Sequence, residues 1–220
     1  MKNVIIVGAG GLAREIYAYA VHCIDAGEKW QIKGFIDDNL NALDTYKYPV
    51  SVISTINDYV PQKDDIFILG VGIPSIKKLL VEKILKKGGI FASLIHPTAV
   101  IGFNVEIGEG VVIFPNTVIS ADVKIGDYVY INSSCTLDHD SSVGEYSTLC
   151  CGCDLTGHVK VGNLVFLSSH VTTVPNTQIG DNTFVGINSF VVGKIKPNIK
   201  ILGNPASEKN YRNWKSKLDT

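Results

Sequence analysis

An aliphatic residue recurs at every sixth position through the second half of this chain. Stepping in sixes from Ile95 to Val191 reaches seventeen positions, of which sixteen are Ile, Leu or Val and one is Thr173. Ile, Leu and Val together make up only 29 of the 97 residues in that segment, so the register does not arise by chance. The position two residues earlier is always Val, Ala, Ser, Thr or Cys, and Gly recurs after the aliphatic position at intervals of eighteen.

A unit of six residues cannot bury its own apolar side chain, so consecutive units must stack against one another. Three units close one coil of a triangular solenoid, because the glycines repeat after every third unit. Residues eighteen apart then lie above one another at the strand spacing of about 4.8 Å, and the aliphatic residues form ladders inside. The pattern predicts an all-β parallel β-helix over residues 95–220, with about five coils and a short C-terminal helix, Glu208–Leu218, that caps the open end.

Residues 1–94 read as a small Rossmann-like α/β domain. The expected strands are Asn3–Val7, Ile32–Ile36, Ile66–Leu69 and Phe91–Ile95, and the expected helices run to about Ala26 and over Ser75–Lys87. This alternation indicates a parallel sheet, whose ligands bind beyond the carboxyl ends of the strands. The candidate ligand residues in the three loops at that rim are Gly8, Gly10, Gly11, Asp37, Asp38, Gly70 and Gly72.

The charge balance excludes some classes of partner. The chain has 20 Lys and Arg against 21 Asp and Glu and no long basic run, so binding to nucleic acid or to a membrane surface is not expected. Met1–Asn3 lead directly into a short apolar run, which is too short for a signal peptide and predicts a cytoplasmic protein. Five cysteines without a secretion signal indicate reduced thiols rather than disulfides.

Three nearby thiols, Cys150, Cys151 and Cys153, invite comparison with a zinc site. Cys153 lies eighteen residues after Cys135, in an inward column of the coils, so it is assigned to the core. The two remaining thiols cannot supply the four ligands of a tetrahedral site. No metal is therefore expected.

One histidine is flanked by carboxylates, because His139 lies between Asp138 and Asp140. It follows the inward Leu137 by two residues, which places it at a coil corner with its side chain outward. An adjacent carboxylate holds an imidazole in one tautomer and stabilises the imidazolium that forms when it accepts a proton, so His139 is a candidate general base. A solvated turn is the alternative interpretation of the same residues.

The small domain, the hexapeptide repeat and three short motifs together resemble the bacterial nucleotide-sugar acetyltransferases of the PglD and NeuD type, within the hexapeptide-repeat acyltransferases. The motifs are Ile131–Ser134, Asp138–Asp140 and Gly203–Ala206. The resemblance covers essentially the whole chain and implies that the β-helix is left-handed. It also implies that His139 is the general base, that Asp140 orients it with Asp138 as the fallback, and that Asn132 lies near the reacting amine.

Gly157 lies one coil of eighteen residues above His139. Stacking brings its backbone close to the histidine, where a free N–H can donate to the thioester oxygen as negative charge develops. The resemblance implies this role, whereas a turn glycine at a repeat corner is the structural alternative. Thr148 and Leu12 stand where PglD has histidine, so the acetyl-CoA contact and the preference for base and sugar are expected to differ.

The resemblance further implies acetyl-CoA as the co-substrate and a nucleotide-linked amino sugar as the acceptor, in homotrimers whose active sites lie between subunits. The residues expected to contact coenzyme A are Gly157, His158, Gly186, Lys194, Gly203 and Pro205. Lys194, Lys196 and Lys200 can meet its phosphates as point charges. The loops of the small domain are expected to hold a single nucleotide, since the domain lacks the two halves that a dinucleotide needs.

The predicted function is transfer of an acetyl group from acetyl-CoA to the amine of a nucleotide-linked 4-amino-4,6-dideoxy sugar, in the making of a surface polysaccharide or glycan. The amine attacks directly, because the repeat places no activated serine or cysteine beside His139. Three alternatives stay open: a sialic-acid-type sugar O-acetyltransferase, a non-enzymatic hexapeptide scaffold, and a nicotinamide-dependent enzyme in which Asp37 accepts ribose hydroxyls.

Overall fold

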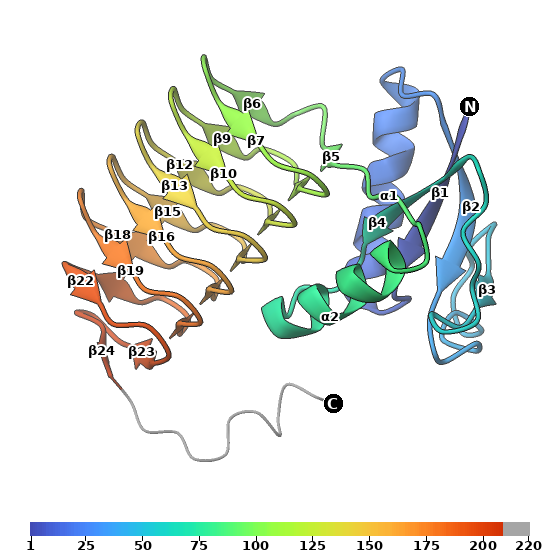
Figure 1. The fold of residues 1–220 in the computed structure, drawn as a ribbon. Coiled ribbons are helices and arrows are strands. Elements are labelled where there is room, and N and C mark those ends of the chain that lie inside the picture. Colours follow the sequence, from blue (N-terminus) through green and yellow to red (C-terminus); the bar gives the residue numbers. More distant parts are fainter. Residues whose placement is uncertain (209–220) are drawn as a thin grey trace.

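The computed structural model describes residues 1–208 of the chain. A small α/β domain and a long solenoid lie side by side, with helix α2 (Pro74–Leu85) reaching toward the solenoid (Figure 1). The expected combination of an α/β domain with a left-handed parallel β-helix is confirmed. The helix expected over Glu208–Leu218 lies outside the described residues apart from Glu208, which belongs to a strand.

The small domain contains four parallel strands in the order β3-β2-β1-β4. Its elements in chain order are β1 (Lys2–Val7), α1 (Gly11–Asp25), β2 (Trp30–Ile36), β3 (Val52–Ser54), β4 (Asp65–Leu69) and α2. The expected strand at Phe91–Ile95 is wrong for this sheet, because Phe91 forms only an isolated bridge with Phe67. Strand β3 was not predicted, since three residues are too few to show a periodicity.

Both helices follow from local sequence. Residues Ala13, Ile16, Ala20 and Cys23 recur at the helical spacing in α1 and are buried. Helix α2 begins with Pro74, whose fixed φ suits the first helical position. No helix within residues 1–208 is long and apolar enough to cross a membrane.

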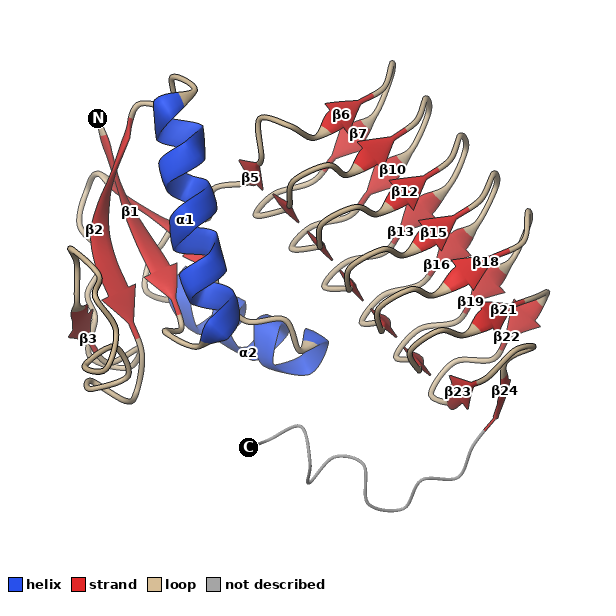
Figure 2. Cartoon of the chain, turned by 180° about the vertical axis from the view of Figure 1, so that it is seen from behind, coloured by secondary structure: helices blue, strands red, loops and turns tan. Residues whose placement is uncertain are grey.

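The solenoid has three sheets, here called the first, second and third faces in the order in which the chain visits them (Figure 2). The first face contains β5 (Leu94–Ile95), β8 (Val112–Ile113), β11 (Tyr130–Ile131), β14 (Thr148–Leu149), β17 (Phe166–Leu167), β20 (Phe184–Val185), β23 (Lys200–Leu202) and the antiparallel β24 (Ser207–Glu208). The second face contains β6 (Val100–Ile101), β9 (Val118–Ile119), β12 (Thr136–Leu137), β15 (Asp154–Leu155), β18 (Thr172–Thr173) and β21 (Phe190–Val191). The third face contains β7 (Glu106–Ile107), β10 (Lys124–Ile125), β13 (Ser142–Val143), β16 (Lys160–Val161), β19 (Gln178–Ile179) and β22 (Lys194–Ile195).

Neighbouring coils pair residues that are eighteen apart, as the repeat predicts. Thr136, for example, pairs with Val118 below and Asp154 above. The last coil is two residues shorter, because Lys194 pairs with Gln178. Fourteen non-glycine residues with positive φ mark the corners of the described coils, and eight of them are Asn or Asp. These two residue types tolerate the left-handed conformation best, which explains their recurrence along the repeat.

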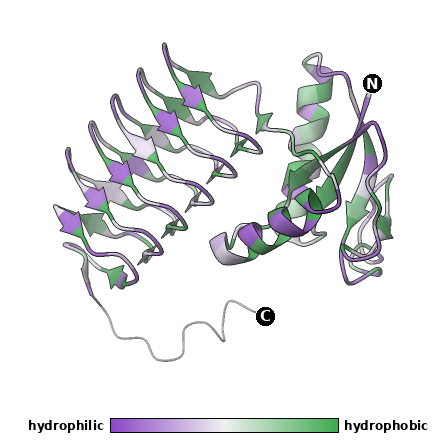
Figure 3. Cartoon of the chain, in the orientation of Figure 1, coloured by the Kyte–Doolittle hydropathy of each residue, from purple (hydrophilic) through white to green (hydrophobic). Residues whose placement is uncertain are grey.

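The inward columns form one continuous apolar core along the solenoid. Many solenoid strands change from hydrophilic to hydrophobic along their length, because successive residues of a strand point to opposite sides (Figure 3). Cys135 and Cys153 lie fully buried in this core, where their thiols donate to the backbone oxygens of Cys150 and Ser168. The assignment of Cys153 to the core is therefore confirmed.

The small domain packs against the first face. Lys77 on α2 is buried, and its Nζ donates to the backbone oxygens of Tyr128 and Ser147 at 3.0 and 2.9 Å, on successive coils. Burial lowers the pKa of Lys77 well below its ordinary value. Thr148 Oγ1 donates to the backbone oxygen of Gly72 at 2.6 Å. These contacts fix the small domain against the solenoid.

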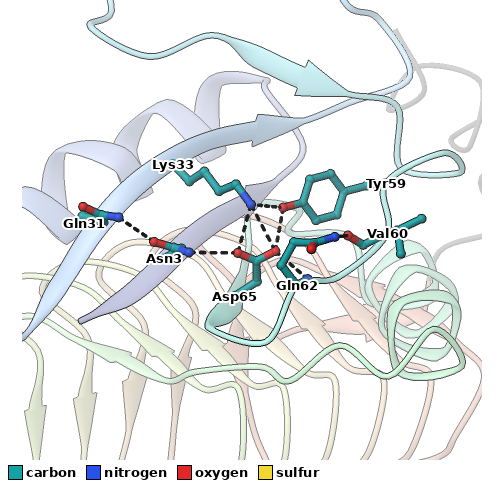
Figure 4. A network of polar contacts seen from close by, with 7 residues as sticks. All are labelled: Asn3, Gln31, Lys33, Tyr59, Val60, Gln62 and Asp65. Carbon is teal, nitrogen blue, oxygen red and sulfur yellow. Dashed lines mark hydrogen bonds and ion pairs between the residues drawn. The ribbon is translucent and has the colours of Figure 1, made fainter.

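A buried carboxylate closes the amino end of the small sheet (Figure 4). The Asp65 side chain is fully buried and accepts hydrogen bonds from Tyr59 Oη at 2.7 Å, the Gln62 N–H at 2.8 Å and Lys33 Nζ at 3.1 Å. Burial alone would raise the pKa of Asp65, but these hydrogen bonds lower it overall. The network lies at the end of the sheet opposite the carboxyl ends of the strands, so its role is structural.

Replacing Asp65 with alanine is expected to reduce the free energy of unfolding by about 3 kcal/mol, because Lys33 and Tyr59 lose their acceptor. The folded-state pKa of Asp65 lies below the unfolded-state pKa, so this stabilisation is present at neutral pH and is lost as the pH falls through the folded-state value. Urea unfolding at neutral and acid pH measures both effects. The control is Asp64→Ala, which removes an exposed ion pair with Lys2 and should cost less than about 1 kcal/mol. Equal stability of the two variants at neutral pH would contradict the assignment.

Candidate active site

His139 and Asp140 form a hydrogen-bonded pair at the corner between β12 and β13. The two side chains are 59% and 48% exposed, and His139 Nδ1 lies 2.8 Å from Asp140 Oδ2. The hydrogen bond from His139 and the positive field of His158 lower the pKa of the Asp140 carboxyl. A carboxylate on Nδ1 leaves Nε2 as the nitrogen that can accept a proton. Among the described residues, the Asp138 side chain makes no hydrogen bond or ion pair with His139, so the geometry favours Asp140 as the partner.

Gly157 lies directly against the imidazole of His139, one coil above it. A Cβ built on Gly157 would come within 2.9 Å of both Cε1 and Nε2 of His139. The Gly157 carbonyl accepts the Asn176 N–H at 3.1 Å, whereas the Gly157 N–H donates to no other described residue. The residue therefore combines a free amide donor with the space that an approaching ligand needs.

His158 adds a second imidazole to the same corner. Its Nδ1 lies 3.7 Å from Asp140 Oδ2, and its ring stands perpendicular to that of His139 with centroids 5.1 Å apart. Asp140 and His158 occupy equivalent corner positions with φ of 59° and 62°, eighteen residues apart. The sequence predicted a coenzyme contact for His158 and missed its place beside Asp140, although the eighteen-residue spacing carried that signal.

Asn132 lies on a different corner from His139. It follows β11, between the first and second faces, and its side-chain oxygen accepts the N–H of Ser133 at 2.7 Å. Thr117 Oγ1 donates to its backbone oxygen at 3.0 Å. Within one chain the structure therefore does not bring Asn132 to the histidine.

Two of the predicted nucleotide-binding glycines are required by packing. A Cβ on Gly70 would lie 2.6 Å from Ala13 Cβ and 2.8 Å from the Val7 oxygen. Gly8 has a φ of +93°, and a Cβ there would come within 3.2 Å of Val71. Both glycines allow α1 and the loop after β4 to approach the end of β1 closely.

Gly10 and Gly11 have no such packing reason. A Cβ on Gly10 would meet nothing within 4 Å, and one on Gly11 would meet only the Arg14 side chain at 3.8 Å. Helix α1 begins here without a side-chain cap and without an acidic residue in its first turn. Its first N–H groups therefore lack intrahelical partners, and bare glycines at a helix N-terminus favour the approach of a phosphate group.

Asp37 and Asp38 hold the neighbouring loops in place. The two carboxylate oxygens of Asp37 accept the N–H groups of Ala9 and Asn39 at 2.7 and 2.8 Å. Asp38 Oδ1 accepts the Ile56 N–H at 3.2 Å. The predicted nucleotide-binding residues thus gather at one rim of the small sheet, and part of their role is to shape that rim.

The two departures from the PglD pattern meet at Gly72. Thr148 donates to the backbone oxygen of Gly72, and Leu12 Cδ2 lies 3.3 Å from the position of a Cβ on the same glycine. The sequence places these residues 136 positions apart, yet the fold makes them neighbours. The departures are therefore one local difference at the junction of the small domain and the solenoid.

The lysines predicted to contact coenzyme A do not share one surface in a single chain. Lys200 and Gly186 line a largely apolar cavity of about 500 Å³ on the first face. Lys194 and Lys196 instead line a groove on the third face. Lys194 and Lys200 are six residues apart, and residues six apart lie on successive faces of a coil, so this separation follows from the repeat itself.

Gly203 and Pro205 lie in the turn between β23 and β24 at the end of the solenoid. The Gly203 N–H donates to Ser189 Oγ at 3.1 Å, and its carbonyl accepts the Phe190 N–H at 3.0 Å. A φ of +117° at Gly203 disfavours any residue with a Cβ. This motif is anchored to β21, on the second face.

The His139–Asp140 pair and the small domain lie on opposite sides of the solenoid. His139 occupies the corner between the second and third faces, whereas the small domain packs against the first face through Lys77 and Gly72. In a triangular coil that corner is the one opposite the first face. A single chain therefore keeps His139 away from its own Gly10–Gly11 loop.

Two family models match this chain in order. Residues 3–84 match the PglD N-terminal domain, and residues 104–139 match the bacterial transferase hexapeptide repeat. The first half of the chain is thus similar to the PglD N-terminal domain, and part of the second half is similar to the hexapeptide transferases. The resemblance stated from the motifs is thereby confirmed.

A curated relative is similar over part of its length. UDP-N-acetylbacillosamine N-acetyltransferase of Bacillus subtilis (strain 168) is 32% identical over 117 residues, which are 51% of this chain and 51% of that protein. The match thus spans about half the length of that relative.

Two solved structures are similar over nearly the whole chain. PerB from Caulobacter crescentus, in complex with CoA and GDP-perosamine, has a TM-score of 0.85 at 28% identity, covering 96% of this chain and 98% of that chain. The acetyltransferase domain of PglB from Neisseria gonorrhoeae FA1090 has a TM-score of 0.84 at 23% identity, covering 95% and 100%. The second likeness supports the fold, and the first places this chain beside a protein that binds coenzyme A and a nucleotide amino sugar.

Proposed function

We propose that this protein is an acetyl-CoA-dependent N-acetyltransferase that acts on the amine of a nucleotide-linked 4-amino-4,6-dideoxy sugar, in surface polysaccharide or glycan biosynthesis. The observation that carries the proposal is the His139–Asp140 pair beneath the free N–H of Gly157. The PglD N-terminal domain and the likeness to PerB with CoA and GDP-perosamine supply the substrate classes.

The proton moves through His139. Its Nε2 accepts the proton of the attacking ammonium or amine, because Nδ1 is engaged by Asp140. The carboxylate stabilises the imidazolium that results and keeps the ring in one orientation. The lowered pKa of Asp140 keeps the carboxylate charged at neutral pH, as this role requires.

The free N–H of Gly157, on the residue that lies against the His139 imidazole, is the donor that we assign to the developing negative charge. When the amine attacks the thioester carbon, the carbonyl oxygen becomes an oxyanion, and the free N–H donates to it. The bare Cα lets the thioester approach the backbone beside the imidazole. The oxyanion then collapses, the C–S bond breaks, and the coenzyme A thiolate leaves and takes the proton that His139 Nε2 had accepted.

Direct attack of the amine on the thioester agrees with the raised pKa or burial of the nearby cysteine thiols. Burial raises the pKa of Cys150 to about 12 and also raises that of Cys151, so neither is an activated thiolate at neutral pH. Cys135 and Cys153 are fully buried. A ping-pong reaction through an acyl-cysteine is therefore not supported.

The nucleotide belongs to the small domain in this proposal. The uncapped α1 terminus with Gly10 and Gly11 offers N–H groups to the diphosphate. The four-stranded sheet is one mononucleotide unit, which favours a nucleotide sugar over NAD. Incubating the protein with acetyl-CoA and a panel of UDP-, GDP- and dTDP-linked 4-amino sugars tests the activity by mass spectrometry. Absence of acetylated product across the panel would contradict the proposal.

The proposed active site lies between subunits of a homotrimer, because one chain separates His139 from its own nucleotide loop. Co-expression of His139→Ala with Gly10→Asp chains tests this arrangement. Gly10→Asp should fold, since a Cβ there meets nothing within 4 Å, but its carboxylate repels the diphosphate. In mixed trimers about one site in four combines an intact histidine with an intact loop, so about a quarter of wild-type activity is expected from two inactive variants. Activity no higher than that of either variant alone would mean that each site uses one chain.

A further inference from the structure

Three metal-ligating side chains meet at one corner of the solenoid. His139, Asp140 and His158 each offer a donor atom, and these atoms all lie within 4.8 Å of one another. Asp140 Oδ2 is central, at 2.8 Å from His139 Nδ1 and 3.7 Å from His158 Nδ1. The cluster follows from the eighteen-residue stacking, which sets the second histidine above the aspartate.

The spacing suits a small divalent ion. Bonds of about 2.0–2.1 Å in a tetrahedral Zn²⁺ site place neighbouring donor atoms about 3.3 Å apart. The two separations from Asp140 Oδ2 lie about half an ångström on either side of that value, and the third, between the two imidazole nitrogens, is at most 4.8 Å, so the imidazoles must move toward each other to bind one ion. All three side chains are roughly half exposed, which leaves them free to make such shifts.

The donor types point to a transition metal rather than to Ca²⁺ or Mg²⁺. Two imidazoles and one carboxylate are typical ligands of Zn²⁺ with an open fourth position, whereas the hard alkaline-earth ions prefer oxygen donors alone. The expectation that the chain binds no metal rests on the thiols around Cys150 alone. The imidazole cluster became visible only when the coils were stacked.

We propose that His139, Asp140 and His158 form a binding site for a divalent transition-metal ion, Zn²⁺ in particular, and that the bound ion blocks the general base. The ion would coordinate His139 and displace its hydrogen bond with Asp140. A neutral imidazole that binds the ion through Nδ1 carries its proton on Nε2, so Nε2 can no longer accept the proton of the amine, and the metal also engages the Asp140 carboxylate. The blocking effect rests on the proposed acetyltransferase activity, whereas the binding itself does not.

Metal binding is tested directly on the full-length protein after treatment with EDTA and desalting. Titration with Co²⁺, followed by visible absorption, should show one site per chain that Zn²⁺ competes for. His158→Asn is expected to weaken binding by at least about tenfold, since it removes one imidazole ligand. Asparagine suits the left-handed corner conformation at this position, so the variant should keep the fold.

Two control variants separate this site from other donors. His170→Asn removes another exposed histidine at an equivalent corner, with a φ of 58°, and should leave the affinity unchanged. Cys151→Ser removes the exposed thiol and should also leave it unchanged. Absence of a Co²⁺ spectrum, or equal affinity in wild type and His158→Asn, would overturn the site.

Inhibition is measured separately. Zn²⁺ should reduce acetyl transfer in the wild type, and EDTA should restore it. Zn²⁺ binding without inhibition would overturn the blocking effect. A protein that binds Co²⁺ through His158 but acetylates no amino sugar would support the metal site and contradict the proposed function, so the two failures are distinguishable.

Discussion

Replacing His139 with alanine is expected to lower kcat for acetyl transfer by about 100-fold or more, with little change in KM for the nucleotide sugar. The imidazole is 59% exposed and makes its hydrogen bond with Asp140, so its loss should hardly affect folding. In the proposed trimer the nucleotide is held by the small domain of a neighbouring subunit and not by His139, which is why KM should change little. Steady-state kinetics with the acceptor found in the substrate panel measures both constants, and a kcat near that of the wild type would remove His139 from the mechanism.

The two acids that flank this histidine supply a matched pair of variants. Asp140→Asn should lower kcat by about tenfold or more, because a neutral amide cannot stabilise the imidazolium. Asp138→Asn makes the same chemical change one residue away from the base on its other side. Since the Asp138 side chain makes no hydrogen bond or ion pair with His139 in the described structure, its variant should stay within about twofold of the wild type. A larger loss of kcat in Asp138→Asn than in Asp140→Asn would assign the orienting role to Asp138.

The solenoid could be predicted because aliphatic residues recur at every sixth position of the sequence. Each coil repeats the same inward aliphatic position, so the register of eighteen by itself predicts that Gly157 lies above His139, as it does in the structure. The same arithmetic placed Cys153 above Cys135 in the core. The fold of a long parallel β-helix can be predicted from its sequence repeat because every coil contacts only the neighbouring coils.

The sequence does not predict the structure at the end of the solenoid, where the repeat stops, or at the junction where two segments distant in sequence meet. The last coil is two residues shorter, since Lys194 pairs with Gln178, so the register of eighteen does not extend to the end of the solenoid. The junction at Gly72, where Leu12 and Thr148 meet, has no periodic signal at all. Contacts between domains depend on packing across the first face, and a repeat describes only what happens within the solenoid.

The packing of Lys77 shows the same limit. A lysine inside an amphipathic helix reads as a surface residue, yet Lys77 is buried against two backbone carbonyls of the solenoid. The fold thereby determines which face the small domain covers. That choice leaves the corner of His139 free and separates it from the nucleotide loop of the same chain.

Replacing Gly157 with alanine is expected to lower kcat by about 10- to 100-fold, while the thermal stability stays close to that of the wild type. The added Cβ would come within 2.9 Å of Cε1 and Nε2 of His139, so the ring must turn away from the place where the amine is deprotonated. The exposed imidazole can move into solvent at little cost to the fold. The same methyl group also obstructs the thioester at the free N–H.

Gly152→Ala supplies the matched control, because its Cβ would press on another corner imidazole, at 2.5 Å from His170 Nδ1. Gly152 has a φ of +66°, so alanine there is strained and should cost about 1 kcal/mol or more of stability. It lies on the corner between the first and second faces, away from His139, and should retain most of the activity. The expected pattern is therefore crossed: Gly157→Ala loses turnover and keeps stability, whereas Gly152→Ala loses stability and keeps turnover. If Gly157→Ala retained wild-type turnover, Gly157 would be a turn glycine only, and the thioester would have to be polarised by a different donor.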